Sequence, residues 1–233
     1  MTDSPTRSAR QDGPDAIWPA DPGALDTATG DPSAVKETDG RRLRRALNRE
    51  AVVDALLDLY SEGNLRPSTD EIAERAGISP RSLFRYFEDA DDLAGEAVAR
   101  QLGRAMPLLP LAVGPDAPFD ILVAALVDQR LRLFITLGQA AHVSRLRAPF
   151  QPRLAKSLRE GRRFLRSQVR TLFAPELMSM TDNEAEAALA AADVLASFES
   201  LQLLTGDQGL PVDEARSVLF AALDVLLTPG GTR

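Results

Sequence analysis

Apolar residues recur every three or four positions along most of the chain after residue 40, and prolines and glycines divide this pattern into segments of helical length. Between residues 46 and 62 the apolar positions are 47, 52, 53, 56, 57 and 60, which lie on one face of a helix. Gly63 and Pro67 follow as a stop signal, because glycine adopts the left-handed conformation that ends a helix and proline prevents its continuation. No segment shows the sustained two-residue alternation of a strand. The sequence therefore predicts an all-α fold class.

The helices fall into two groups, with the change near residue 107. Ser68 and Glu71 have the spacing of a capping box, and Pro80 is suited to the first turn of the next helix. The expected helices span residues 46–62, 68–76, 80–87 and about 89–106, followed by 119–146, 153–173, 182–204 and 212–227. This order predicts an N-terminal head of three helices, a connecting helix and a helical-bundle body.

Composition excludes several classes of site. The 233 residues include no cysteine, and this absence rules out a disulfide framework, a cysteine nucleophile and a thiolate zinc site. They include one histidine, His142. One histidine also leaves little for a Ser/His/Asp triad, and neither glycine-rich phosphate-binding motif occurs. The apolar runs are too short to span a bilayer, and the first 40 residues lack a signal-peptide pattern. We expect a cytoplasmic protein that is not an enzyme and uses no metal or cofactor.

The charge is distributed unevenly. The chain has 27 basic and 34 acidic residues, but the proline-rich segment 1–40, expected to be a disordered leader, alone carries 3 basic and 8 acidic residues. Five arginines follow within nine residues that contain no acid: Arg41, Arg42, Arg44, Arg45 and Arg49. Because nucleic-acid binding depends on where charge lies, a locally basic face can operate in an acidic chain.

A helix-turn-helix pattern lies between residues 68 and 87. Gly77 can take the positive φ that ends the second helix, and Ile78 and Leu83 are expected to be buried between the helices. The third helix would then expose a polar side, which suits a helix in the major groove of duplex DNA. The alternative is an ordinary pair of helices that happens to carry a glycine at the turn.

Residues 47–93 resemble the DNA-binding domain of the tetracycline-repressor (TetR) family of bacterial regulators. The matching positions are 51, 52, 55, 56, 59–63, 68, 69, 72, 73, 76–79, 82–87 and 93. The resemblance implies a helix-turn-helix DNA-binding domain at 41–93 and a ligand-binding and dimerisation domain at 94–233. It also implies a homodimer that binds duplex DNA at a palindromic operator.

The resemblance assigns DNA contacts to particular residues. Recognition-helix contacts would come from Ser79, Pro80, Arg81, Ser82 and Arg85, with Phe84 and Tyr86 against the DNA backbone and Thr69 on a phosphate. The local charge, and not the resemblance, adds a basic arm of Arg41, Arg42, Arg44 and Arg45 before the first helix. In one departure, Ala90 stands where the family usually has a phosphate-binding lysine, and Asp89 and Asp91 flank it. That contact is lost, and the flanking acids are expected to repel phosphate.

The helix expected at 182–204 is apolar on two opposite sides, and such a helix needs two partners. The helix expected at 212–227 adds a broad apolar arc. We expect one partner to be a second subunit, with an interface formed by Ala188, Ala192, Ala196, Leu203, Leu219, Leu223 and Leu226. The alternative is that these helices are internal to the body.

A ligand site is expected between the connecting helix and the helix at 119–146. Its candidate residues are Met106, Phe134, Gly138, His142, Arg145 and Phe164, although residues of these types more often belong to the plain core. A separate stripe of arginines, from Arg159 to Arg170, is either a solvated face paired with acids or a site for an anion.

Together these features predict a DNA-binding transcriptional regulator, a repressor released from its operator by an apolar small molecule. The alternative is a ligand-binding or protein-interaction module that has lost its affinity for DNA.

Overall fold

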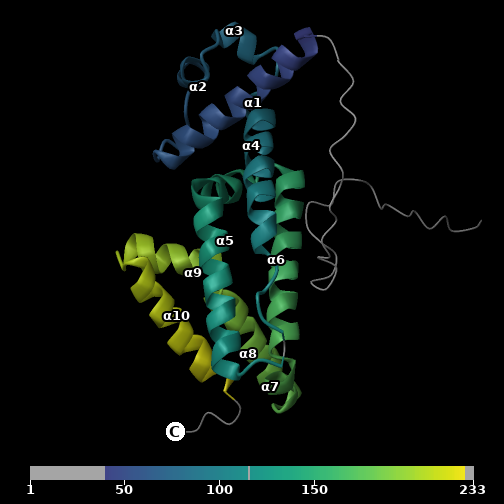
Figure 1. Cartoon of the computed structure of the whole chain (residues 1–233), viewed down its shortest axis with the longest axis vertical. Helices are drawn as coiled ribbons and strands as arrows, with labels where there is room; N and C mark the ends of the chain where they lie inside the picture. The colour runs from purple at the N-terminus through teal and green to yellow at the C-terminus, as the bar shows by residue number, and fades with distance from the viewer. Residues whose placement is uncertain (1–39, 115, 229–233) are drawn as a thin grey trace, which may run out of the picture.

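The computed structural model describes residues 40–114 and 116–228, so the expected leader lies outside the described residues except for Gly40. All regular elements of this part of the chain are helical, which confirms the all-α fold. A small head lies at one end of an elongated body, and α4 and α5 run between them (Figure 1). The α-helices are α1 (Gly40–Ser61), α2 (Thr69–Arg75), α3 (Pro80–Leu83), α4 (Ala90–Ala105), α5 (Phe119–Arg147), α6 (Pro152–Leu172), α7 (Ala174–Met178), α8 (Asp182–Leu195), α9 (Phe198–Gln202) and α10 (Val212–Leu227).

Short-range hydrogen bonds set the ends of the head helices. The Ser68 hydroxyl accepts from the Glu71 amide (3.2 Å) and the Glu71 carboxylate accepts from the Ser68 amide (2.7 Å), the reciprocal pair that opens α2. Helix α3 ends at Leu83 and not near residue 87. The amides of Arg85 and Tyr86 bond three residues back, at 3.1 and 2.9 Å, so the chain tightens after one helical turn.

The body departs from the sequence-based expectation in two helices. The helix expected at 182–204 is divided, because Ser197 opens α9 by accepting from the Ser200 amide (3.2 Å), and the axis bends there by 48°. Helix α5 is kinked at Gly138, whose φ of 49° and ψ of −139° are not helical. The short helix α7 was not expected.

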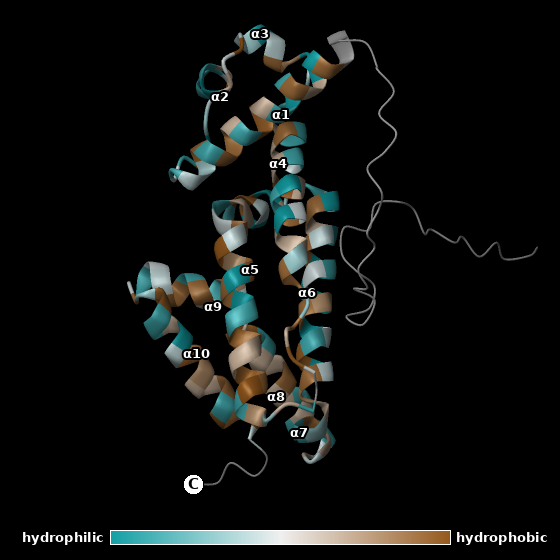
Figure 2. Ribbon diagram, viewed as in Figure 1, coloured by the Kyte–Doolittle hydropathy of each residue, from teal (hydrophilic) through white to brown (hydrophobic). Residues whose placement is uncertain are grey.

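Two hydrophobic cores occupy the two ends of the molecule. The larger core fills the body and includes buried side chains of α5, α6, α8, α9 and α10. Hydrophobic residues, in brown, are frequent along these helices (Figure 2). The smaller core fills the head, with Tyr60, Leu83 and Phe87 among its most buried side chains. Ala140 and Val143 belong to this smaller core although they lie on α5, so one side of the α5 segment beyond Gly138 packs into the head, while Ala141 of the same segment belongs to the body core.

Ion pairs hold α1 against α4. The Arg49 guanidinium donates to both carboxylate oxygens of Glu96, at 2.7 and 3.1 Å, while Arg100 and Arg104 both contact Asp54, at 3.1 and 2.9 Å. Half-exposed pairs of this kind contribute little to stability, typically about 0–1 kcal/mol each. Their value lies in fixing the orientation of the connecting helix beneath the head.

Among the described helices, none alone has the length and apolar character needed to cross a membrane; α8 with the bent segment that follows it meets those criteria only as a pair.

The Gly138 kink predicts a matched pair of stability effects. Replacing Gly138 by Ala forces a side chain into a positive φ, which should lower the free energy of unfolding by about 1–3 kcal/mol. Replacing Gly103 by Ala, in regular helix with open space around its Cβ position, should raise it by about 0.5–1 kcal/mol. Urea unfolding followed by circular dichroism measures both changes. If both substitutions changed the free energy of unfolding by the same amount, the conclusion that Gly138 needs a positive φ would be wrong.

Candidate nucleic-acid interface

The turn between α2 and α3 has the geometry of a helix-turn-helix. Gly77 adopts a φ of 67°, and the Ile78 amide donates to the Ala73 carbonyl at 3.0 Å, which closes the end of α2. Ser79 then caps α3 by accepting from the Ser82 amide at 3.3 Å. Leu83 is buried in the head core, and this anchor leaves the opposite side of α3 exposed.

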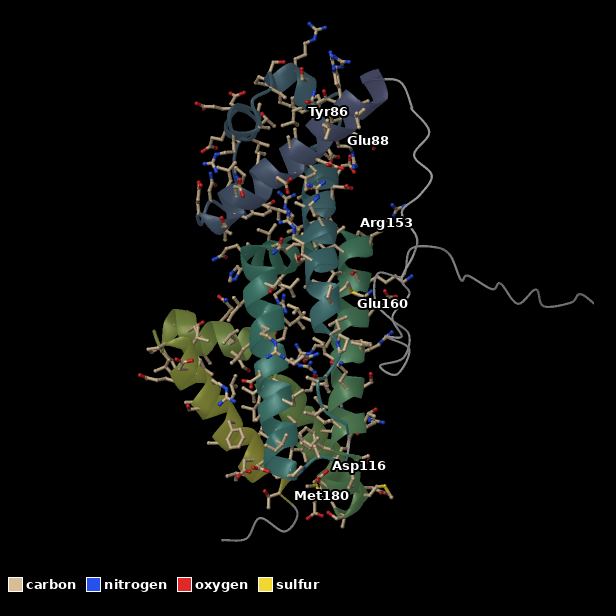
Figure 3. The ribbon with its side chains drawn as sticks, in the orientation of Figure 1. Tyr86, Glu88, Asp116, Arg153, Glu160 and Met180 are labelled. Atoms are coloured by element: carbon tan, nitrogen blue, oxygen red, sulfur yellow. The ribbon has the colours of Figure 1, made fainter. Side chains whose placement is uncertain are left out.

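The side of the head around α3 gathers the residues expected to contact DNA. Pro80, Arg81 and Arg85 are exposed, Ser82 is half-buried, and the Phe84 ring is 57% exposed. Tyr86 lies at the head end of the molecule (Figure 3), with its hydroxyl accepting from the Asn48 amide group at 3.0 Å. That hydrogen bond ties the end of the α3 turn to α1.

The basic arm approaches the same turn. Arg44 and Arg45 are exposed on the first turns of α1, and the Arg45 guanidinium donates to the Arg85 carbonyl at 3.3 Å. The side chains of Arg41 and Arg42 lie outside the described residues. Thr69 is half-buried at the first position of α2. The structure thus brings the described arm residues and the α3 turn to one end of the head.

Arginines of the head divide into two groups by their partners. Arg49, Arg75, Arg100 and Arg104, on α1, α2 and α4, each pair with a carboxylate. Within the described part of the chain, no ion pair is formed by Arg44, Arg45, Arg81 and Arg85 near α3, or by Arg66 in the loop between α1 and α2. The acids of the head therefore neutralise the arginines that orient its helices, and the cations around α3 remain available to an anionic partner.

The acids flanking Ala90 have structural partners. Asp89 caps α4 by accepting from the amides of Asp91 and Asp92, at 2.8 and 2.7 Å, and the Asp91 carboxylate pairs with Arg147 of α5. Both interactions use these carboxylates to hold the connecting helix. Ala90 itself is exposed and offers no cation to a phosphate.

The expected ligand residues do not line one common cavity. Gly138 lines a cavity of 220 Å³ between α1, α4 and the α5 kink, which lies at the head and not inside the body. Phe134, His142 and Arg145 instead converge on the ring of Phe198, and Arg145 lies 4.3 Å from its centroid. Met106 packs against the body core, and Phe164 is buried within it.

A larger cavity of 820 Å³ lies between α4 and α6. Its walls carry the acids Asp91, Asp92, Glu96 and Glu160 together with Arg153 and Lys156; Arg153 and Glu160 lie along α6 (Figure 3). The arginine stripe of the same helix is largely neutralised, because Arg162, Arg166 and Arg170 pair with acids of α8 and α9. Within the described ranges, no group of three or more histidine, cysteine or acidic side chains could hold a metal ion.

Sequence reasoning missed a buried polar cluster in the body. Gln129, Arg130 and Gln168 are each at most 3% exposed, and they meet beneath the segment that follows α4. The sequence did contain a signal that Arg130 is buried. Residues 126, 127, 133 and 134 lie three and four positions from it, on the same side of the helix, and all are apolar.

Most of the residues expected at a dimer interface are buried in the body core instead. Ala188, Ala192, Ala196, Leu219 and Leu223 are at most 7% exposed, and Leu226 packs against the same core, whereas Leu203 is 50% exposed. The sequence identified the apolar helices, but the side it assigned to a partner is the side that faces the chain's own core. The exposed apolar side chains of α8 and α10 are Val194, Val218 and Val225.

Comparisons with known proteins agree with this architecture. Residues 52–97 match the family model described as bacterial regulatory proteins, tetR family. A transcriptional regulator from Rhodococcus sp. Rha1 superposes with a TM-score of 0.59 at 20% identity, over 77% of this chain and 95% of its own. A candidate transcriptional regulator from Pseudomonas aeruginosa PAO1 gives 0.52 at 20% identity, over 81% and 92%. No curated protein matches the chain.

At this level of identity the two structures show a shared fold, and the likeness to the family model lies in the head. The matched segment begins within α1, includes the complete helix-turn-helix and ends within α4. The head of this chain is therefore similar to the bacterial regulatory proteins of the tetR family.

Proposed function

We propose that this chain is a transcriptional repressor that binds a palindromic operator as a homodimer and is released by a small-molecule effector. The observation that carries the proposal is the group of exposed arginines without acidic partners around α3. Guanidinium groups recognise guanine edges and phosphates, and a helix end presented away from the body can enter the major groove. A two-fold axis would set two such heads about 34–36 Å apart, which is one turn of DNA.

The basic arm supports the same proposal. Arg44 and Arg45 lie beside the α3 turn, so phosphates flanking the groove would find cations on α1. This arrangement compensates for Ala90, which supplies no charge at the start of α4. The competing function, a ligand-binding module without DNA affinity, is favoured by Ala90 and by the net charge of −7, and it predicts no selection of duplex DNA.

The DNA-binding proposal predicts the outcome of a selection experiment. Wild-type protein should enrich a palindromic sequence from a pool of random duplexes. Each of Arg81→Ala and Arg85→Ala should then weaken binding to that sequence by about 1–3 kcal/mol, or roughly 5- to 150-fold. Gel retardation at fixed salt measures the change, with circular dichroism as the folding check.

The matched control is Arg75→Ala, because Arg75 is an exposed arginine of the same head whose guanidinium pairs with Glu62 at 2.8 Å. It should bind the selected duplex as wild type does. If Arg75→Ala weakened binding as strongly as Arg81→Ala, the assignment of α3 as the recognition element would be wrong, and absence of any enrichment would favour the competing module.

The proposed dimer uses the outer side of α8 and α10. These helices pack against each other, and Val194, Val218 and Val225 on their outer side are 56%, 45% and 71% exposed. The alanines Ala187 and Ala221 extend the same side and let a second pair of helices approach closely. Two copies related by a two-fold axis would bury this surface in a four-helix interface.

This interface predicts that Val218→Glu combined with Val225→Glu yields monomers. The carboxylates would be buried without partners in the dimer, at a cost of several kcal/mol, but would stay solvated in the monomer. Sedimentation velocity measures the change at micromolar concentration. Met178→Glu is the control, since Met178 on α7 is 84% exposed and lies outside this surface. A double variant that sediments as the wild type does would refute the interface.

A further inference from the structure

Arg130 is a cation buried in the body without an acid beside it. Its side chain, on α5, belongs to a residue that is 2% exposed. Among the described residues, no carboxylate lies within ion-pair distance of its guanidinium. The acid with an electrostatic effect on Arg130 is Asp193, whose carboxylate pairs with Arg162 at 3.2 Å. A buried charge is normally paired, because removing it from water is costly.

The groups that do contact Arg130 are neutral oxygens. Nη1 donates to the side-chain carbonyls of Gln129 and, at 2.9 Å, Gln168, and Nη2 donates to the Leu165 carbonyl at 2.8 Å. The Nε–H group is buried with no acceptor in the structure. Arginine has five N–H donors, so the cluster leaves part of its hydrogen-bonding capacity unused.

The charge persists at neutral pH. Burial lowers the pKa of Arg130, partly opposed by the charge of Asp193, to about 9. A group with this pKa remains protonated at pH 7, so the body core contains a positive charge that its own side chains do not neutralise.

We propose that the body binds an anionic effector, an amphipathic carboxylate whose headgroup pairs with Arg130. The proposal rests on the proposed function, because it takes the ligand of the body to be the effector that releases DNA. It also replaces the apolar effector expected from the sequence. A carboxylate accepts from guanidinium in a bidentate geometry and supplies the charge that the cluster lacks.

An apolar remainder of the ligand follows from the surroundings. Phe134 lies one helical turn from Arg130, and Phe164 lies one turn from Gln168; both are buried. The rest of the surrounding core is aliphatic and aromatic. An ion without a tail would gain the charge contact and none of this apolar burial, so a short carboxylate should bind weakly.

The same cluster offers a connection to the head. Gln129 and Gln168 both donate to the carbonyl of Leu109, which lies in the segment directly after α4. Through these bonds the amides that contact Arg130 also hold the end of the connecting helix. A carboxylate that takes the Arg130 donors competes with the glutamine oxygens, and the position of Leu109 changes with them.

The test uses three probes on the full chain: decanoate, decan-1-ol and acetate, all below micellar concentration. Isothermal titration measures their dissociation constants. Decanoate should bind the wild type more tightly than decan-1-ol, which has the tail without the charge, or acetate, which has the charge without the tail. Arg130→Met should weaken decanoate binding by about tenfold to a hundredfold, as expected for loss of a charged hydrogen bond, and leave decan-1-ol unchanged. Arg130→Lys should restore part of the affinity.

Arg216→Met is the matched control, because Arg216 on α10 already pairs with Asp128 of α5, at 2.6 Å, and should not affect decanoate. Gln168→Glu provides the test should Arg130→Met fail to fold. It places a carboxylate where the amide oxygen accepts from Arg130, so it should block decanoate and spare decan-1-ol. Unchanged decanoate binding in the Arg130 or Gln168 variant, or a wild type that does not prefer decanoate to decan-1-ol, would overturn the proposal.

Retardation of the selected duplex by wild-type protein without any probe separates this result from the repressor function. If the protein without probe does not retard the duplex, the proposed repressor function is wrong. The carboxylate site is then judged by the titrations alone. If the duplex binds and decanoate also binds, added decanoate should lower the fraction of retarded duplex. Decanoate bound through Arg130 without that effect would overturn its role as an effector.

Discussion

The packing of Ala140 and Val143 into the head core is the contact on which the coupling of head and body depends. A head of some fifty residues buries little apolar surface alone, and small cores are marginal. Here the segment of α5 beyond Gly138 and the first turns of α4 complete that core. Because α5 also lines the body core before the kink, any rearrangement of the body reaches the head through a packed helix as well as through α4.

Electrostatics in this chain are local. An overall charge of −7 would repel DNA if it were evenly spread, yet several acids of the head are occupied in caps and ion pairs. Asp89 caps the start of α4, Asp54 and Glu96 orient the helix, and Glu62 pairs with Arg75. The arginines around α3 have no such partners among the described residues. Arg130 differs in another way, because it is the arginine of the described body that is buried, and it has no carboxylate within ion-pair distance.

Features with a local cause were predictable from the sequence. The capping box of Ser68 and Glu71 and the turn at Gly77 depend on neighbouring residues only, and the structure has both. For a helix with several apolar sides, the sequence did not indicate which side packs against the body and which is exposed. Helix α8 carries small apolar residues around most of its circumference, so periodicity could not say which side meets the body and which stays exposed. Burial places Ala192 inside and Val194 outside.

Long-range features were also beyond sequence reasoning. The kink at Gly138 and the break at Ser197 arise where helices must pass other helices, and neither residue prohibits a continuous helix. Arg130 was overlooked because a charged residue is assumed to reach solvent, and its burial is decided by Gln129 and Gln168 from two different helices. In each case tertiary packing decided between local alternatives.

The most direct test of the coupling between head and body uses the two tyrosines, Tyr60 and Tyr86, which both lie in the head. Protein labelled with 3-fluorotyrosine reports the unfolding of the head alone by ¹⁹F NMR, while far-ultraviolet circular dichroism is dominated by the longer helices of the body. If the head depends on α5 for its core, both signals should follow one cooperative transition with the same urea midpoint. A head that unfolds at a clearly lower urea concentration than the body would contradict this account.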